Sequence, residues 1–302
     1  MPALSRREWL RLALGATALA LGGASMAAPT ILRRPVPKTG EPLPVIGLGT
    51  WQTFDVPEDR SAPLREVLDA FVRLGGSVVD SSPMYGRSES VLGALAADLG
   101  IRDRLFIATK VWTQGRDAGV RQMEESLRRL RTETVDLMQV HNLVDWRVHL
   151  ETLKRWKTEG RTRYVGVTHY TESAYGELEG ALKNEAVDFV QLNYSVAERA
   201  AERRLLPLAA ERRVAVLVNR PLAAGALFGK VRATPLPPWA AEAGAASWAE
   251  FFLKFVISHP AVTCALPATS NPSHLAENMR AGLPPLPDAA MRERMARYVA
   301  AL

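Results

Sequence analysis

Four residues with complementary chemistry follow short apolar runs of the sequence. Asp80, Lys110 and His141 each end such a run, and Tyr85 follows Asp80 after a Ser-Ser-Pro turn. A carboxylate at the end of a buried strand needs a cation partner, and Lys110 is the candidate. If the runs are neighbouring parallel strands, all four side chains meet at one edge. The pattern therefore predicts an active-site edge.

The chemistry available to this set is acid catalysis on a carbonyl group. A free tyrosine titrates near pH ~10, and a nearby ammonium such as Lys110 can supply part of the shift needed at neutral pH. Asp80 would keep Lys110 charged and oriented, and His141 could donate a hydrogen bond to a carbonyl oxygen. Such a set suits reduction by a hydride. Because no side chain supplies hydride, a nicotinamide cofactor is implied.

Taken singly, each residue also has a structural interpretation. Asp80 could cap a helix, Tyr85 could be a rim aromatic, Lys110 could be a solvated lysine and His141 a core histidine. Their joint occurrence at successive strand ends favours the catalytic interpretation.

The elements that would position these residues alternate regularly. From Ile46 onwards, apolar runs of strand length alternate with amphipathic helical stretches in eight units. This α/β pattern predicts a (β/α)8 TIM barrel in a single domain, with an open doubly wound sheet as the alternative. Chemistry after several different strands favours the barrel. The expected strands are 45–51, 78–80, 105–109, 135–140, 164–167, 187–192, 214–218 and 262–266.

Composition sets further bounds. The chain has 302 residues, with 47% hydrophobic and 23% charged residues and a net charge of +6, which is ordinary for a globular protein. Basic residues do not form a stripe interleaved with aromatics, so nucleic-acid binding is not expected. The single cysteine, Cys264, excludes an intrachain disulfide and a paired-cysteine zinc site, and we interpret it as a small core residue. No metal is expected.

The N-terminus has the features of an export signal. Arg6 and Arg7 precede a weakly apolar run, 12–24, and Ala27 ends a Ser-Met-Ala sequence suited to signal peptidase. The apolar run is shorter than the ~20 residues that span a bilayer. We therefore expect a twin-arginine signal peptide at 1–27, a barrel domain at 28–302, the twin-arginine export machinery as a partner, and a periplasmic location. An uncleaved amphipathic tail is the alternative.

Several motifs resemble those of the aldo-keto reductases, and the resemblance extends from about Ile46 to Asn278. The matching motifs are Gly47-Leu-Gly-Thr-Trp51, Asp80-Ser-Ser-Pro-Met-Tyr-Gly86, Ala108-Thr-Lys-Val-Trp112, Gln139-Val-His141, Gly166-Val-Thr168, Gln191-Leu-Asn-Tyr-Ser195 and the segment from Pro267 to Asn278. The resemblance implies Tyr85 as general acid, completed by Asp80, Lys110 and His141. It also implies a small carbonyl or alcohol substrate, with Trp51, Met84 and Trp112 lining its mouth.

The resemblance further implies a cofactor extended across the top of the barrel. Thr168, His169 and Gln191 would lie near the nicotinamide carboxamide. The remaining implied contacts follow the last two strands and are Asn219, Arg220, Pro221, Leu222, Gly225, Thr269, Ser270, His274 and Asn278. NADP(H) is expected in preference to NAD(H).

Some positions depart from the family pattern. His169 stands where many members have asparagine, and Asn219 stands where many stack an aromatic ring on the nicotinamide. Ala268 and His274 replace the lysine and arginine that often hold the 2′-phosphate, which removes the strongest phosphate contact. We hypothesise that Arg220 compensates by reaching the cofactor phosphates.

Two other classes of function remain as alternatives. One is a nucleotide-binding sensor or interaction module on the same barrel, without significant turnover. The other is a metal-dependent barrel hydrolase, although the first strand lacks the His-x-His pair that such sites use. The short tail after Pro284 suggests an open mouth and broad specificity. The sequence leaves the physiological substrate and the oligomeric state open.

Overall fold

The computed structural model describes residues 30–302. The expected signal peptide, residues 1–27, lies outside the described residues. Among the residues that are described, none of the helices is both long and apolar enough to cross a membrane.

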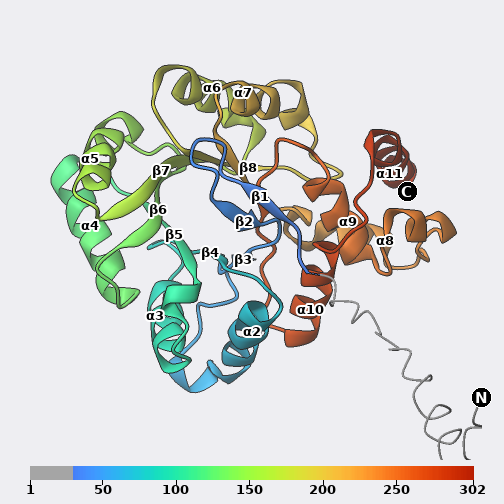
Figure 1. Cartoon of the computed structure of the whole chain (residues 1–302), viewed down its shortest axis with the longest axis horizontal. Coiled ribbons are helices and arrows are strands. Elements are labelled where there is room, and N and C mark those ends of the chain that lie inside the picture. The colour runs from blue at the N-terminus through green and yellow to red at the C-terminus, as the bar shows by residue number, and fades with distance from the viewer. Residues whose placement is uncertain (1–29) are drawn as a thin grey trace, which may run out of the picture.

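Eight parallel strands form the centre of the molecule, and each pairs with its neighbours in chain order (Figure 1). Parallel bridges from Ile46 to Ala265 and from Gly49 to Ala268 join the first strand to the last and close the barrel. The predicted (β/α)8 barrel is confirmed, and the open sheet is excluded. The strands are β3 (Leu48–Gly49), β4 (Val78–Asp80), β5 (Phe106–Val111), β6 (Val135–His141), β7 (Thr162–Thr168), β8 (Phe189–Asn193), β9 (Ala215–Asn219) and β10 (Cys264–Ala265).

Helices surround the barrel. They are α2 (Ala62–Arg73), α3 (Ser88–Asp98), α4 (Arg116–Arg129), α5 (Trp146–Thr158), α6 (Tyr175–Asn184), α7 (Leu205–Glu211), α8 (Ala226–Val231), α9 (Trp248–Ile257), α10 (Pro272–Ala281) and α11 (Ala289–Ala301). Short 3-10 helices lie at 58–60, 102–104, 172–174, 200–203, 223–225 and 238–243. The chain from Pro272 onwards forms two helices, α10 and α11, because it turns after Ala281 and Asp288 caps α11 by accepting from Met291 N.

The amphipathic pattern that predicts the helices is clearest in α2. Its buried residues Leu64, Val67, Leu68 and Phe71 recur at helical spacing and face the barrel. A proline in the first turn suits the helix start, where an amide donor is not needed. Gly75, with φ of +90°, ends the helix in the left-handed conformation.

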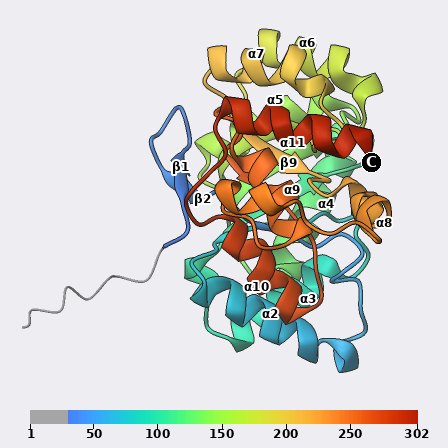
Figure 2. The same ribbon diagram turned by 90° about the vertical axis from the view of Figure 1, so that its right-hand side faces the viewer.

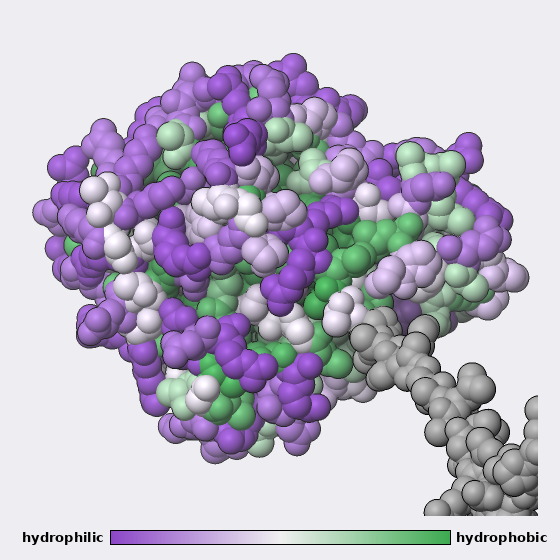
Figure 3. Space-filling view, in the orientation of Figure 1, coloured by the Kyte–Doolittle hydropathy of each residue, from purple (hydrophilic) through white to green (hydrophobic). Residues whose placement is uncertain are grey.

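An N-terminal hairpin closes one end of the barrel. Its strands β1 (Arg33–Pro35) and β2 (Pro42–Pro44) are antiparallel, and the hairpin projects from one side of the ring of helices (Figure 2). Val36 and Leu43 belong to the same apolar cluster as the barrel-interior residue Phe106. Hydrophilic side chains cover much of this outer face (Figure 3). The hairpin covers the end of the barrel where the strands begin. A functional site is therefore expected at the opposite end, where the strands finish.

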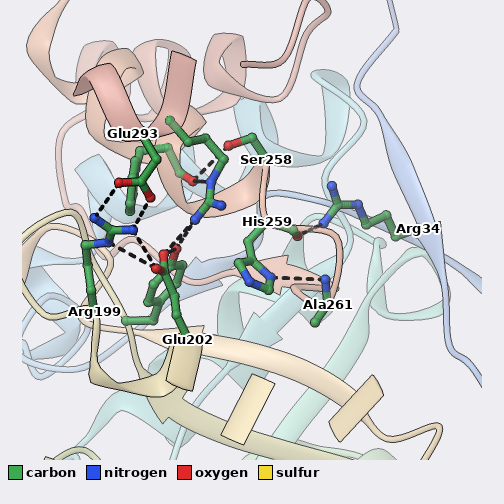
Figure 4. A network of polar contacts seen from close by, with 10 residues as sticks. Arg34, Arg199, Glu202, Ser258, His259, Ala261 and Glu293 are labelled. Atoms are coloured by element: carbon green, nitrogen blue, oxygen red, sulfur yellow. Dashed lines mark hydrogen bonds and ion pairs between the residues drawn. The ribbon is translucent and has the colours of Figure 1, made fainter. Parts of the chain in front are cut away.

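Charged residues fix the last helix to the barrel. Glu202 receives hydrogen bonds from Arg292 of α11 at 2.8 Å and from Arg199 at 2.7 Å. Arg199 also pairs with Glu293, so it lies between two carboxylates (Figure 4). Tyr194 donates its hydroxyl to Glu202. These contacts hold α11 against the segment that follows β8.

Close packing of α3 against the end of α4 gives a stability prediction. A Cβ atom on Gly93 would lie 2.2 Å from the Arg129 carbonyl oxygen, which is backbone and cannot rotate away. We expect Gly93→Ala to destabilise the protein by roughly 1–3 kcal/mol, the usual range for overpacking. Thermal unfolding would measure it.

Gly180 of α6 supplies the matched control for this variant. A Cβ there meets no atom within 4 Å, so Gly180→Ala should be neutral or stabilising by roughly 0.5–1 kcal/mol. A Gly93→Ala protein that melts as late as Gly180→Ala would contradict the close approach.

Candidate active site

A buried ion pair occupies the end of the barrel opposite the hairpin. Lys110 Nζ donates to Asp80 Oδ2 at 2.6 Å and to the Ser81 carbonyl oxygen at 2.7 Å. The other Asp80 oxygen accepts from Gln191 Nε2 at 2.8 Å and from Gln139 Nε2 at 3.3 Å. Lys110 is fully buried and Asp80 is 4% exposed. A buried pair is held only when its other hydrogen bonds are satisfied, and this one has them.

Tyr85 approaches the pair from the turn that follows β4. The Lys110 ammonium lies 4.9 Å from the Tyr85 ring centroid. The turn is sealed by Gly86, with φ of +60°, which packs against the Asp55 carboxylate. Asp55 Oδ1 also accepts from Arg87 N at 2.9 Å. The loop after β3 therefore braces the turn that carries the phenol.

His141 completes the group from the end of β6. Its ring meets the Tyr85 ring edge-on, with centroids 5.7 Å apart and planes at 83°. Its Nδ1 is 2.9 Å from Ser82 Oγ, which leaves Nε2 as the nitrogen available to a ligand. Tyr85, Asp80, Lys110 and His141 thus lie together in the structure.

Burial and charge set the protonation of these groups. Burial lowers the pKa of His141 to about 2, helped by the positive charge of Lys110, so the imidazole is neutral at pH 7. Burial would also lower the pKa of Lys110. The Asp80 carboxylate outweighs it, with help from Tyr85, so the pKa of Lys110 is raised and the ammonium stays charged.

Tyr85 differs from the sequence-based expectation. Burial raises the pKa of its phenol by more than the Lys110 charge lowers it, so the net shift is upward rather than toward neutrality. The adjacent Asp80 carboxylate raises the pKa further. The phenol is therefore protonated at neutral pH, which is the form that can give up a proton.

A second chain of hydrogen bonds runs from the pair to the neighbouring strands. Thr168 at the end of β7 donates to Gln191 Oε1 at 3.1 Å, and Gln191 donates in turn to Asp80. Beside them, Asn219 Nδ2 donates to the His169 carbonyl oxygen at 3.2 Å. The predicted carboxamide-binding residues are therefore continuous with the predicted catalytic ones.

Unsatisfied polar atoms gather at the end of β9. Within residues 30–302, Asn219 Oδ1, Arg220 Nε and Glu198 Oε2 are buried without a hydrogen-bond partner. The Arg220 guanidinium pairs with Glu198 at 3.6 Å, and its backbone has a φ of +50°. Buried polar groups without partners are rare in proteins, so these atoms fit contacts to a polar ligand.

The other predicted cofactor contacts lie in the segments that follow β9 and β10. In the segment between β9 and α8, Pro221 is buried, Leu222 is half-buried and Gly225 is exposed. After β10, the Thr269 hydroxyl accepts from Asn271 N at 3.1 Å and is thereby occupied within its own turn. Ser270 and His274 are exposed and Asn278 is buried.

The mouth of the site is apolar and open. Trp51, Met84 and Trp112 are 45%, 37% and 41% exposed, respectively. Trp112 lies 6.5 Å from His141, centroid to centroid. Its backbone is held by Gln122, which accepts from Trp112 N and donates to Trp112 O at 3.1 Å.

Sequence reasoning missed several residues that position the site. Ser82 and Gln139 stand inside matching motifs and Glu198 and Gln122 outside them, but none of the four is among the predicted site residues, which they contact. The available signals were the Ser-Ser-Pro turn for Ser82 and the motif Gln139-Val-His141 for Gln139. In the described part of the chain, no three His, Cys, Asp or Glu side chains are grouped as a metal site would require.

Comparisons with known proteins agree on one family. The model of the Aldo/keto reductase family matches residues 45–296. The Escherichia coli (strain K12) protein named methylglyoxal reductase YeaE is 30% identical over 245 residues, which cover 78% of this chain and 84% of that protein. The Bacillus subtilis (strain 168) aldo-keto reductase YhdN is 29% identical over 204 residues, covering 62% and 60%.

Solved structures give the same result. An aldo-keto reductase from Klebsiella pneumoniae in complex with NADPH has a TM-score of 0.74 at 28% identity, covering 90% of this chain and 95% of that one. A second structure from that organism, in complex with NADP and acetate, has a TM-score of 0.70 at 28% identity, with 86% and 93% covered.

Proposed function

The chain belongs to the aldo/keto reductase family, and we propose that it reduces a small aldehyde or ketone with NADPH, with Tyr85 as the proton donor. The observation that carries the proposal is the position of the Tyr85 ring beside the buried Lys110–Asp80 pair, with 4.9 Å from ring centroid to ammonium. The relative YeaE is named a methylglyoxal reductase, which supports a small carbonyl substrate.

The proposed mechanism divides the work among the four residues. A bound NADPH supplies the hydride. His141 Nε2 donates a hydrogen bond that orients the carbonyl oxygen, and Tyr85 gives its proton to that oxygen as negative charge develops. Lys110 stabilises the tyrosinate left behind, and Asp80 holds Lys110 in place. The neutral imidazole can donate without adding a competing charge.

The proposed cofactor contacts follow from the donor and acceptor groups at the rim. Thr168, His169 and Gln191 would hold the nicotinamide carboxamide. Asn219 Oδ1 and Arg220 Nε, which are buried without a partner, would contact polar groups of the cofactor beyond the carboxamide. Neighbours solved with NADP and NADPH support NADP(H) as the cofactor. The remaining proposed contacts are Pro221, Leu222, Gly225, Thr269, Ser270, His274 and Asn278.

A binding and turnover test decides between the reductase and the sensor alternative. We expect NADPH to quench the tryptophan fluorescence of the protein and to bind more tightly than NADH. The complex should then oxidise NADPH when methylglyoxal or another aldehyde is added. Nucleotide binding without turnover across an aldehyde panel would favour the sensor, and absence of nucleotide binding would refute both.

The protonation states give a pH prediction for the reduction. His141, with its pKa lowered to about 2, stays neutral, and Tyr85, with its pKa raised, stays protonated until strongly alkaline pH. Activity that needs a protonated Tyr85 is lost only as pH rises through that raised value. We expect kcat at saturating NADPH to change less than about threefold between about pH 6.5 and about pH 9. A several-fold change centred near the ordinary histidine pKa would contradict the neutral His141.

A further inference from the structure

We propose that His169 makes the relative affinity for oxidised and reduced cofactor depend on pH, and that the Thr171 amide holds its imidazole as a neutral donor at neutral pH. The inference rests on the proposed function, since it concerns how this chain binds NADP⁺ and NADPH. It starts from the position of an ionisable ring beside the residues proposed to hold the carboxamide.

The backbone of His169 is fixed at the rim between two strands. Its amide donates to the Gln191 carbonyl oxygen of β8 at 3.0 Å, and its carbonyl accepts from Asn219 of β9 at 3.2 Å. The preceding residue, Thr168, is buried and bonded to the Gln191 side chain. The ring therefore starts from a rigid position next to the proposed carboxamide contacts.

The side chain is also oriented, and its tautomer follows from one contact. Thr171 N lies 3.2 Å from His169 Nδ1. A backbone N–H can only donate, so Nδ1 must be the bare nitrogen and Nε2 must carry the proton. The ring stacks on Tyr170, with centroids 5.5 Å apart and planes within 3°. Nε2 has no hydrogen-bond partner among residues 30–302, which leaves its N–H free to serve a ligand.

Protonation changes this arrangement in a defined way. The second proton would enter at Nδ1, which faces both the Thr171 N–H and the Thr171 hydroxyl oxygen, each at 3.2 Å, and would turn the ring into a cation. Burial lowers the pKa of His169, opposed by the Glu177 carboxylate of α6. Glu177 already accepts from Trp146 Nε1 at 2.7 Å. The ring is therefore neutral at neutral pH and gains its charge only in acid.

The charged groups around His169 come from several elements. His141 on β6 is neutral in this range, because its pKa is about 2. From β8 and β9 the adjacent side chains are Gln191 and Asn219, which do not titrate. Beyond Asn219, the charge of Arg220 is paired with Glu198 at 3.6 Å. Of the groups named here, His169 is therefore the one whose charge changes as the pH falls from neutral.

The two cofactor forms differ by one charge at the ring that this residue would contact. The oxidised nicotinamide is a cation and the reduced one is neutral, so a cationic His169 repels the oxidised form selectively. Two like charges a few ångströms apart near a protein surface repel strongly enough to change affinity by about tenfold or more. Acid pH should therefore weaken NADP⁺ binding relative to NADPH binding.

The test is a pair of dissociation constants measured by fluorescence titration on the full chain. We expect the ratio of Kd for NADP⁺ to Kd for NADPH to rise in the wild type between about pH 8 and about pH 5, toward about tenfold as His169 becomes protonated. The ratio should stay constant in His169→Asn, which keeps a donor but does not titrate. Titration of the 2′-phosphate, which both cofactor forms carry, cancels in the ratio.

A second readout tests the tautomer without any cofactor. In protein with ¹⁵N-labelled histidine, the signal lost in His169→Asn should be that of an Nε2–H imidazole at pH 8. An Nδ1–H signal would overturn the role of Thr171. A ratio that is flat with pH in the wild type, or still pH-dependent in His169→Asn, would overturn the inference while leaving the reductase proposal standing. Absence of any nucleotide binding would instead refute the proposed function.

Discussion

Replacing Tyr85 by phenylalanine is expected to lower kcat for aldehyde reduction by about 10²–10⁴-fold, the usual contribution of a positioned general acid. The change removes only the hydroxyl, so the ring can still pack edge-on against His141 at the 5.7 Å centroid spacing. NADPH affinity should stay within about threefold of wild type, because a proton given in the transition state adds little to ground-state binding. Steady-state rates with methylglyoxal and a fluorescence titration measure the two quantities.

Tyr298→Phe is the matched control for loss of a tyrosine hydroxyl. Tyr298 lies on α11 and stacks on Trp248, on a helix at the outside of the barrel. This variant should keep the wild-type kcat. Equal rates in Tyr85→Phe and Tyr298→Phe would remove the catalytic role proposed for Tyr85.

Lys110→Met should cost about 3–5 kcal/mol of the free energy of unfolding, because it leaves the Asp80 carboxylate buried without its cation. The Lys110 side chain is fully buried and its ammonium makes two hydrogen bonds, to Asp80 and to the Ser81 carbonyl. In the variant, the Asp80 carboxyl should have a folded-state pKa above its unfolded value. Folding then favours the neutral carboxyl, so the stability that the variant loses relative to the wild type should become smaller as pH falls. Denaturant unfolding at two pH values measures this.

The double variant Asp80→Asn/Lys110→Met separates stability from catalysis. It removes both charges, so most of the lost stability should return, since replacing a whole buried pair is often nearly neutral. Activity should stay low, because the phenol still lacks its ammonium. If Lys110→Met alone unfolds like the wild type, the pair is not buried as described. If the double variant recovers full activity, the ammonium has no part in the reaction.

The fold could be predicted because parallel barrel strands are buried on both faces. Runs such as 214–218 are then continuous and apolar, and they are easy to separate from amphipathic helices. The stretch from Pro221 to Ala246 is rich in Gly, Pro and Ala and has no clear helical pattern, yet it contains α8. That helix has six residues and follows a turn in which Ala223, Ala224 and Gly225 all have positive φ, so packing rather than periodicity determines it.

The site was predictable where residue type and strand end coincide. Asp80, Lys110 and His141 each end a strand or lie next to its last residue, and the closure of the barrel brings them together. Ser82 and Gln139 could not be assigned, because their roles depend on neighbours brought close by other strands. The direction of the Tyr85 pKa shift could not be predicted from the sequence either, because it depends on how deeply the phenol is buried. Export by the twin-arginine route stays a prediction.

The most direct test is a single turnover on protein already loaded with NADPH. Methylglyoxal is mixed with the complex in a stopped-flow instrument, and the absorbance of the reduced nicotinamide is followed. We predict that the wild type oxidises its bound NADPH to completion. Tyr85→Phe should do so at least about 10²-fold more slowly with an unchanged NADPH Kd. A Tyr85→Phe complex that oxidises its NADPH at the wild-type rate would contradict the account.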